Sequence, residues 1–531
     1  MKYTNPIISG FHPDPSICRV EEDYYLVTSS FEFFPAIPLF HSKNLVDWEQ
    51  IGHCVTKSEY LPLMHGNPNA SGIYAPTIRY HDGTFYVICT NVPAADTTDT
   101  RYGNFIVKTT NPYGEWSEPI WIDCKGIDPS LFFDEDGKAY FCGTNGGIYF
   151  CQINPDTGEI LSEQKYIWNG TGGCAPEAPH IYKRGDWYYL MIAEGGTEYG
   201  HMETIARSRT IEGPYEAYEK NPILTNRSLG LPIMATGHAD LIEDNRHNWW
   251  AVCLGIRPIS YPNRHNLGRE TFLAPVKWTE DEWPIIGNQG VVEVEIETNL
   301  LEESKALEER KILEESKGLD EREDSLKVAK AGEPYEFYDD FSSETLHPRW
   351  AYQFNPDFDA IKHDTSGLWL KGKETTLSDA SGSTLLAFRQ MHHTCSVRFK
   401  MNFQPQQDGE EAGIAIYMNR DHHYEMALTC MEGKNYLIVR RRIGSLWRIE
   451  QKIVCEETEL YMELDATMEL YRFRYSKDES TYFELGSGET TYLTTEVGGK
   501  FTGNFIAFYA TGNGQVCENP ACIEWVHYKA E

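Results

Sequence analysis

The sequence predicts an all-β protein of two domains, a five-bladed β-propeller followed by a β-sandwich. Three observations support this fold class. A strand–turn–strand pattern recurs five times in the first half, and short alternating strands fill the last part of the chain. Aromatic residues make up 13% of the 531 residues, a supply that suits sheets better than helix bundles. The length also favours two domains of unequal size over one core.

The repeat opens with "HPDPSICRVEEDYYLV" and returns as "APTIRYHDGTFYVI", "DPSLFFDEDGKAYFC", "APHIYKRGDWYYLM" and "HADLIEDNRHNWWAV". Each unit is a small or acidic residue, often next to Pro, then a short apolar strand, a polar turn and an aromatic-rich strand. A unit of about 40 to 50 residues that contains several short strands is typical of a propeller blade. We therefore predict five blades over residues 1–295.

The repeat predicts a ring of side chains at one end of the propeller axis, because the first strand of every blade lines that axis. The ring positions are Asp14, Ala75, Asp128, Ala178 and His238, with Glu177 just before Ala178. Asp14 stands between Pro13 and Pro15, which are expected to hold it and its neighbour in extended geometry and so to aim its carboxylate. A single aspartate here would more often belong to a turn. Three carboxylates at related positions favour a site.

After the propeller, residues 296–333 are expected to form an acidic linker, helical or disordered. Its six-residue repeat scatters the leucines around a helix, so a coiled coil is disfavoured. Residues 334–531 read as an antiparallel sandwich, with alternating segments such as "CSVRFKMNF" and "NFIAFYATG". The pairs His392-His393 and His422-His423 are interpreted as surface or packing residues rather than metal ligands.

Composition limits the partners. A formal net charge of -33 disfavours nucleic acid and anionic membranes, whereas a small neutral oligosaccharide is compatible. The N-terminal "MKYTNPIISGFHPDPS" has no apolar stretch of signal-peptide length, so a cytoplasmic location is expected. Thirteen cysteines without a CxxC pair fit reduced, buried thiols better than disulfides or zinc ligands.

The ring suits one chemistry in particular. Glycoside hydrolysis needs two carboxyl groups on either side of the scissile bond, one protonated and one ionised. Carboxyl groups on different blades stand naturally far enough apart to admit a water molecule, as an inverting mechanism requires. A third carboxylate between them would raise the pKa of the acid by repulsion between like charges.

The motifs "GFHPDPSI", "GIDPSLFFDEDGKAY", "EAPHIYKRGDWYYLM", "TGHADLIED" and "LGRETFL" resemble those of the β-xylosidases of glycoside hydrolase family 43, in the same order along the chain. The resemblance extends into the C-terminal part and implies a concanavalin-like sandwich and an inverting reaction. It implies Asp14 as general base, Asp128 as the residue that orients the acid and raises its pKa, and Glu177 as general acid.

The same resemblance implies five substrate-binding residues: Arg269, His238, Phe31, Tyr74 and Phe501. The arginine would contact both the sugar and the base, and the phenylalanine of "FTGNF" would close the pocket from the sandwich. Where relatives carry "GIWAPT" this chain has "GIYAPT", which should change the sugar contacts. No cofactor is expected to be required, although Ca²⁺ on the axis near His238 is possible in such proteins, and the metal ligands stay unknown.

The resulting expectation is an exo-acting inverting hydrolase that releases xylose from the non-reducing end of β-1,4-xylo-oligosaccharides. An α-L-arabinofuranosidase, or an enzyme with both activities, is the close alternative, because the two sugars place similar hydroxyl groups. A carbohydrate-binding propeller without catalysis is disfavoured by the three carboxyl groups. The resemblance also makes a homo-oligomer possible.

Overall fold

The computed structural model describes residues 1–63, 71–93, 99–301, 335–380, 382–499 and 501–530. These residues are nearly all strand, turn and loop, and the helical elements in them are two single turns, Thr490–Leu493 and α2 (Thr495–Gly498). The predicted all-β class with a five-bladed propeller and a sandwich is therefore confirmed. Most of the expected linker, residues 302–333, lies outside the described residues. No helix in the described segments is long and apolar enough to cross a membrane.

Five antiparallel sheets form the propeller; four of them are built from consecutive strands, and the first omits β4, which lies between β3 and β5 along the chain. Blade one contains β2 (Ser16–Val20), β3 (Asp23–Val27), β5 (Ala36–Ser42) and β6 (Glu49–Val55), and blade two contains β7 (Gly72–Ile73), β8 (Thr77–His81), β9 (Thr84–Val92), β10 (Gly103–Thr109) and β11 (Ile120–Ile122). Blade three contains β12 (Ile127–Phe133), β13 (Ala139–Thr144), β14 (Ile148–Ile153) and β15 (Lys165–Trp168), and blade four contains β16 (Glu177–Arg184), β17 (Trp187–Glu194), β18 (Met202–Ser208) and β19 (Glu216–Ala217). Blade five contains β20 (Met234–Glu243), β21 (Trp249–Ile256), β22 (Glu270–Trp278) and β23 (Pro284–Ile286). Each predicted repeat unit supplies the first two main strands of one blade.

The N-terminal segment closes the propeller against its last blade. β1 (Lys2–Thr4) pairs with β24 (Glu295–Glu297), and Ile8 bridges to Thr271 on β22. The buried side chain of Asn5 donates to the carbonyls of Leu273 and Glu293 and accepts from the Leu273 amide. These bonds give partners to backbone groups of the last blade that would otherwise be buried without a hydrogen bond.

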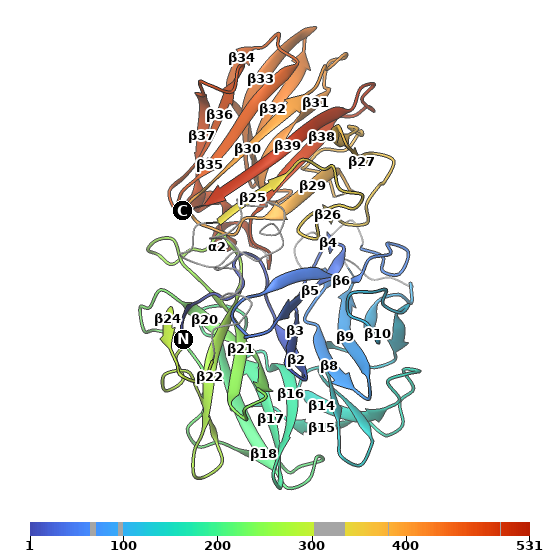
Figure 1. Ribbon diagram of the computed structural model, residues 1–531, viewed down its shortest axis with the longest axis vertical. Helices are drawn as coiled ribbons and strands as arrows, with labels where there is room; N and C mark the ends of the chain where they lie inside the picture. Colours follow the sequence, from blue (N-terminus) through green and yellow to red (C-terminus); the bar gives the residue numbers. More distant parts are fainter. Residues whose placement is uncertain (64–70, 94–98, 302–334, 381, 500, 531) are drawn as a thin grey trace, which may run out of the picture.

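The sandwich consists of two eight-stranded antiparallel sheets. One sheet contains β25 (Tyr335–Asp339), β27 (Ile361–Asp364), β28 (Gly367–Leu370), β30 (Cys395–Asn402), β35 (Glu459–Ala466), β36 (Leu470–Ser476), β37 (Phe483–Glu489) and β39 (Ala521–Ala530). The other contains β26 (Ala351–Gln353), β29 (Thr384–Arg389), β31 (Glu411–Asn419), β32 (His422–Met431), β33 (Lys434–Ile443), β34 (Leu446–Val454), β38 (Phe505–Thr511) and β4 (Phe33–Phe34). β4 comes from the propeller part of the chain and pairs with β26 at the junction of the two bodies (Figure 1).

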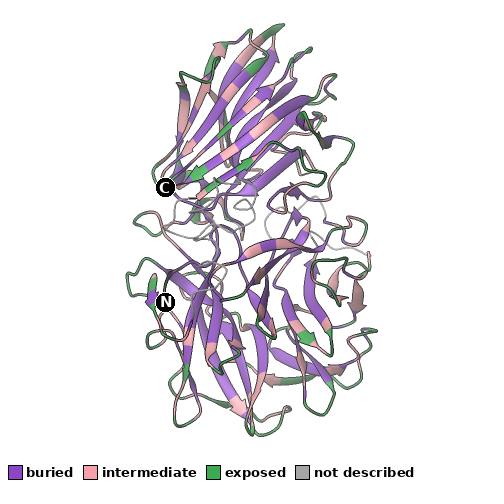
Figure 2. Ribbon diagram, in the orientation of Figure 1, coloured by how far each residue is buried: buried purple, intermediate pink, exposed green. Residues whose placement is uncertain are grey.

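Apolar side chains fill the space between the two sandwich sheets and the seams between blades, so the strand centres are buried and exposure concentrates at turns (Figure 2). The junction also belongs to the core. Phe31 and Phe33 of the propeller pack in one buried cluster with Phe505 and Tyr509 of β38. Burial of large aromatic rings on both sides stabilises the docking of the sandwich on the propeller.

Candidate active site

The ring predicted from the repeat exists, and its backbone is unusual. Asp14, Asp128, Ala178 and His238 all have left-handed backbones, with φ of 55°, 52°, 53° and 51°. In the last three blades the pairing register of the inner strand shifts at this point, between Ile127 and Ser130, between Glu177 and His180, and between Gly237 and Asp240. Left-handed non-glycine residues cost about 1–3 kcal/mol each and cluster at functional sites.

The extended geometry expected for Asp14 is therefore wrong. A following proline disfavours the right-handed helical region, but aspartate tolerates the left-handed one, which Asp14 adopts here. The side chain of Asp14 is nevertheless directed towards partners on other elements, as the repeat predicts for a carboxylate of the ring. Of the five ring positions, Ala75 is the one without a left-handed backbone.

Asp14 is buried and held by three groups. Its carboxylate accepts hydrogen bonds from Ser29 Oγ (2.5 Å) and Arg269 Nη1 (2.7 Å), and His238 Nδ1 lies 3.7 Å away. Burial by itself raises the pKa of Asp14, but the charges of Arg269 and His238 and the bond from Ser29 outweigh it, and the net pKa lies below its ordinary value. Asp14 is therefore ionised across the neutral range.

Arg269 precedes β22 and shares its guanidinium between Asp14 and Thr197, whose Oγ1 lies 3.1 Å from Nη1. Its Nε and Nη2 are buried and have no hydrogen-bond partner among the described residues. The guanidinium carbon lies 5.6 Å from the ring centre of Phe31 and 5.7 Å from that of Phe501. Two unpaired donors enclosed by aromatic walls fit the binding of hydroxyl groups of a sugar.

Glu177 begins β16 and keeps 17% of its side chain exposed. Burial, and then the negative charge of Asp14, raises the pKa of Glu177 to about 7, although Arg269 opposes the shift. Glu177 therefore keeps its proton at a pH at which Asp14 is already ionised. This opposition of two carboxyl groups is the pattern of an acid and a base.

Asp128 lies beside the strand that begins at Glu177, and its Oδ2 accepts a hydrogen bond from the Ala178 amide (3.3 Å). Burial, and then the charges of Glu177 and Asp14, raise the pKa of Asp128 well above its ordinary value. The resemblance implied that a charged Asp128 lifts the pKa of Glu177. In the structure the charge of Glu177 contributes to the raised pKa of Asp128, and the charge of Asp14 raises the pKa of both carboxyl groups.

The three predicted aromatic residues lie together. Ring centres are 5.0 Å apart for Phe31 and Tyr74, 5.8 Å for Phe31 and Phe501, and 6.2 Å for Tyr74 and Phe501. Burial, followed by the charge of Asp128, raises the pKa of Tyr74 to about 12, which links this wall to the carboxyl ring. Phe501 reaches the site from the sandwich, so the two domains together line it.

Several residues around the site carry no signal in the repeat. Ser29 lies at the end of β3, and Thr197 and His201 lie in the loop after β17. The sandwich also holds the segment that leads to Arg269. Tyr471 accepts from the side chains of Asn266 and Asn504 (2.8 Å each) and donates to Gln390 (2.9 Å). Gly503 lies so close to this segment that a Cβ would stand 2.2 Å from the Leu267 carbonyl oxygen.

Below the ring, the axis holds an arginine rather than a cluster of ligands. Arg79 pairs with Asp240 (2.7 Å) and contacts His180 Nδ1 (2.9 Å), and Asp240 also accepts from Ser16 and Tyr182. No group of three or more His, Cys, Asp or Glu side chains in the described segments is arranged to hold a metal ion. The Arg79 guanidinium adds positive charge beside Asp240 and His180, so these residues do not fit the Ca²⁺ considered near His238.

The four histidines of the sandwich pairs are buried, which favours packing over a surface role. His392 Nδ1 lies 2.9 Å from Tyr528 Oη, and His393 Nδ1 lies 3.2 Å from Asn266 Oδ1. His393 thus contributes to the contact between the domains.

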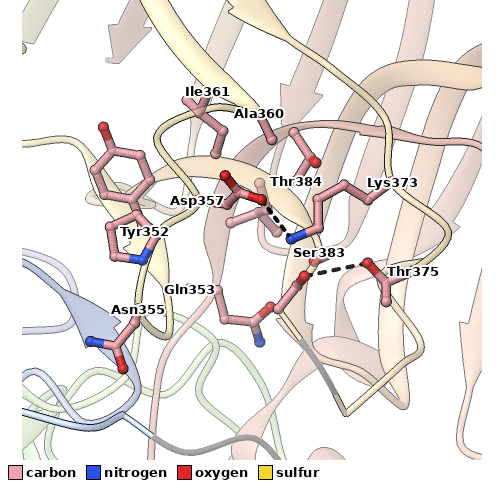
Figure 3. A pocket seen from close by; sticks show the side chains of 13 residues that line it. Tyr352, Gln353, Asn355, Asp357, Ala360, Ile361, Lys373, Thr375, Ser383 and Thr384 are labelled. Atoms are coloured by element: carbon pink, nitrogen blue, oxygen red, sulfur yellow. Dashed lines mark hydrogen bonds and ion pairs between the residues drawn. The ribbon is translucent and has the colours of Figure 1, made fainter. Parts of the chain in front are cut away.

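A cavity of about 180 Å³ lies in the sandwich, beside β26 and β29 (Figure 3). Its polar side chains pair with their neighbours, Lys373 with Asp357 (3.2 Å) and Thr375 with the Gly382 carbonyl (3.3 Å). None of the three ring carboxyl groups lines it. The candidate active site is therefore the ring and not this cavity.

Comparison with known proteins agrees with the geometry. Residues 3–284 match glycosyl hydrolases family 43, and residues 338–529 match the beta xylosidase C-terminal concanavalin A-like domain. The chain is 39% identical to a non-reducing end α-L-arabinofuranosidase of Bacteroides ovatus, over 99% of this chain and 94% of that one. It is 31% identical to a β-xylosidase of Bacillus subtilis over 100% of both chains.

A solved structure from Bacteroides ovatus, described as the GH43B protein of a xyloglucan locus, superposes with a TM-score of 0.90 at 38% identity and covers 100% of both chains. The matches thus span both domains and the ring that carries the carboxyl groups. The chain belongs to glycoside hydrolase family 43 and is a glycoside hydrolase.

Proposed function

We propose that this hydrolase is exo-acting and inverting and releases xylose from the non-reducing end of β-1,4-xylo-oligosaccharides. The observation that carries the proposal is the pair of carboxyl groups with opposite pKa shifts, Asp14 lowered and Glu177 raised to about 7, on different blades of one ring. Such a pair supplies one base and one acid at the same pH.

Each residue then has one role. Glu177 gives its proton to the oxygen of the leaving group as the glycosidic bond breaks, and the ionised Asp14 takes a proton from the water that attacks the anomeric carbon. The free donors of Arg269 bind hydroxyl groups of the sugar, while Nη1 keeps the Asp14 carboxylate oriented. Asp128 holds the strand that carries the acid through its bond from the Ala178 amide.

Exo action is supported by the aromatic walls. Phe31, Tyr74 and Phe501 enclose one side of the ring, and Phe501 comes from the other domain. A pocket closed in this way accepts one terminal sugar and stops a longer chain from passing through. The segment that carries Phe501 is tied to the propeller, because the Asn504 amide donates to the Asn266 carbonyl (2.8 Å).

An α-L-arabinofuranosidase is the second candidate, and two observations favour it. The relative at 39% identity is named as one, and Tyr74 puts a hydroxyl group into the wall where the β-xylosidase motif carries tryptophan. Both pentoses use the same acid and base. The preference for a xyloside or an arabinofuranoside therefore depends on the aromatic residues around the sugar rather than on the carboxyl groups.

Paired assays with 4-nitrophenyl β-D-xylopyranoside and 4-nitrophenyl α-L-arabinofuranoside test the proposal. A higher kcat/KM on the xyloside supports the first candidate, and a higher value on the arabinofuranoside supports the second. NMR of the first product from the xyloside tests inversion: α-xylose is expected. If β-xylose appears first, the water-activating role of Asp14 is wrong.

A further inference from the structure

His201 lies against the acid, outside the repeat that supplies the ring. Its side chain is fully buried between blades four and five, just before β18. The imidazole packs closely against Gly237: a Cβ at this glycine would lie 2.6 Å from ring atoms of His201. A glycine before ring residue His238 thus makes room for this histidine.

The contacts of the ring define its tautomer. Nδ1 lies 3.3 Å from the carbonyl oxygen of Ala235, which can only accept, so Nδ1 carries the proton. Nε2 is then a bare acceptor, and it has no hydrogen-bond partner among the described residues. It faces Glu177 Oε1 at 3.8 Å. Burial, and then the charge of His238, lowers the pKa of His201 to about 3, so the imidazole stays neutral at working pH.

We propose that His201 is a positioning residue for Glu177: its bare Nε2 faces the carboxyl group and favours the form that carries a proton. The inference rests on the proposed role of Glu177 as acid. A protonated carboxyl group can donate a hydrogen bond to the Nε2 lone pair once the distance of 3.8 Å shortens to hydrogen-bond length. An ionised carboxylate has no proton to donate, so two acceptors would then face each other. After each turnover the same contact favours return of the proton to Glu177.

Other charged groups face Glu177 and set the background. Asp14 on the first blade raises its pKa, and Arg269 before β22 lowers it. Asp128 on β12 and Glu203 on β18 are carboxyl groups whose own pKa values are raised in part by Glu177. All four stay in place when His201 is changed, so a difference between variants at this position reports on the imidazole.

The test compares His201→Gln with His201→Phe in the full-length protein. Glutamine offers an amide N–H to Glu177 and so favours the carboxylate, whereas phenylalanine keeps a flat ring on Gly237 but offers neither donor nor acceptor. The alkaline limb of kcat/KM on a substrate with a poor leaving group should move down by about one pH unit in His201→Gln and by less in His201→Phe. His53→Gln, another buried histidine with a lowered pKa, is the matched control and should leave the limb unmoved.

A measurement without turnover separates this inference from the proposed function. The Glu177 carboxyl group is titrated by ¹³C NMR in the free protein, with Glu177→Gln to assign its signal. A lower midpoint in His201→Gln supports the inference even if Glu177→Gln shows that Glu177 is not the acid. An unchanged midpoint in folded His201→Gln, or equal shifts in the Gln and His53 variants, overturns it.

Discussion

The propeller and the sandwich contribute to one site in different ways. The propeller supplies every group proposed to handle a proton, at positions related by the blade repeat, and holds Asp14, Asp128 and His238 in left-handed backbones. The sandwich supplies a single aromatic wall, Phe501, and the hydrogen bonds of Tyr471 around the segment before Arg269. The propeller repeat therefore supplies the titratable groups of the candidate site, whereas the sandwich supplies an aromatic contact and hydrogen bonds to the segment before Arg269.

The largest expected effect lies in the propeller, where Asp14→Asn and Glu177→Gln should fail in different ways. Asp14→Asn should lower kcat by about 10³ to 10⁴ on all substrates, because water must be activated whatever leaves. Glu177→Gln should cost about as much with a poor leaving group but about tenfold or less with 2,4-dinitrophenolate, whose departure needs little protonation. Steady-state kinetics on a leaving-group series measures both.

The control is the comparison between the two variants on the activated substrate. Rescue of Asp14→Asn by the activated group, together with no rescue of Glu177→Gln, would mean that the acid and base are assigned the wrong way round.

The repeat made half of this site predictable from sequence. The motifs that begin at Asp14, Asp128 and Glu177 recur with a strand and an aromatic turn, so their common place on the axis could be inferred, and so could the five blades. The left-handed backbone of Asp14 could not be predicted, because a proline after this residue argues only against the right-handed helical region and leaves the extended and left-handed regions open. Thr197 and His201 escaped notice because they lie in a loop that no repeat position marks.

The strands of the sandwich could be predicted from the sequence, but the contacts between distant segments could not. Alternating segments predicted its strands, but the partners of Tyr471 lie 205, 33 and 81 residues away along the chain. Hydrophobic periodicity reports only local structure, so it cannot predict contacts between residues this far apart along the chain. Phe501 is a candidate site residue through the family resemblance alone, and in the structure its ring centre lies 5.8 Å from that of Phe31.

A second prediction concerns the cost of keeping the acid protonated in the propeller. The folded-state pKa of Glu177 is about 7 against an ordinary value of 4.5, so between these values the unfolded chain releases a proton that the folded protein retains. Below pH 4.5 this group has no effect, and as the pH rises through 7 it destabilises the native state by about 3 kcal/mol.

Glu177→Gln cannot titrate and should therefore be more stable than the parent at pH 8, by an amount that vanishes near pH 4. Denaturant unfolding at both values measures it, and a stability difference independent of pH would contradict the raised pKa. His393→Gln in the sandwich contact is a useful comparison of opposite sign: burial lowers the pKa of His393 to about 3, so its replacement should favour the folded state more at pH 4 than at pH 8.

The smallest expected effect on catalysis tests whether the sandwich positions Arg269. Tyr471→Phe removes one buried hydroxyl group, which accepts from the side chains of Asn266 and Asn504; Asn504 keeps its second acceptor, the Leu493 carbonyl. We expect a loss of stability of about 3 kcal/mol and a fall in kcat/KM of about tenfold, mainly through KM, because the segment before Arg269 loosens while the carboxyl groups stay in place. Tyr475→Phe, on the same strand β36 but half-buried, should change neither. If folded Tyr471→Phe keeps the parent kcat/KM on a disaccharide, the sandwich contributes closure through Phe501 alone, and the arginine is positioned entirely by the propeller through Asp14 and Thr197.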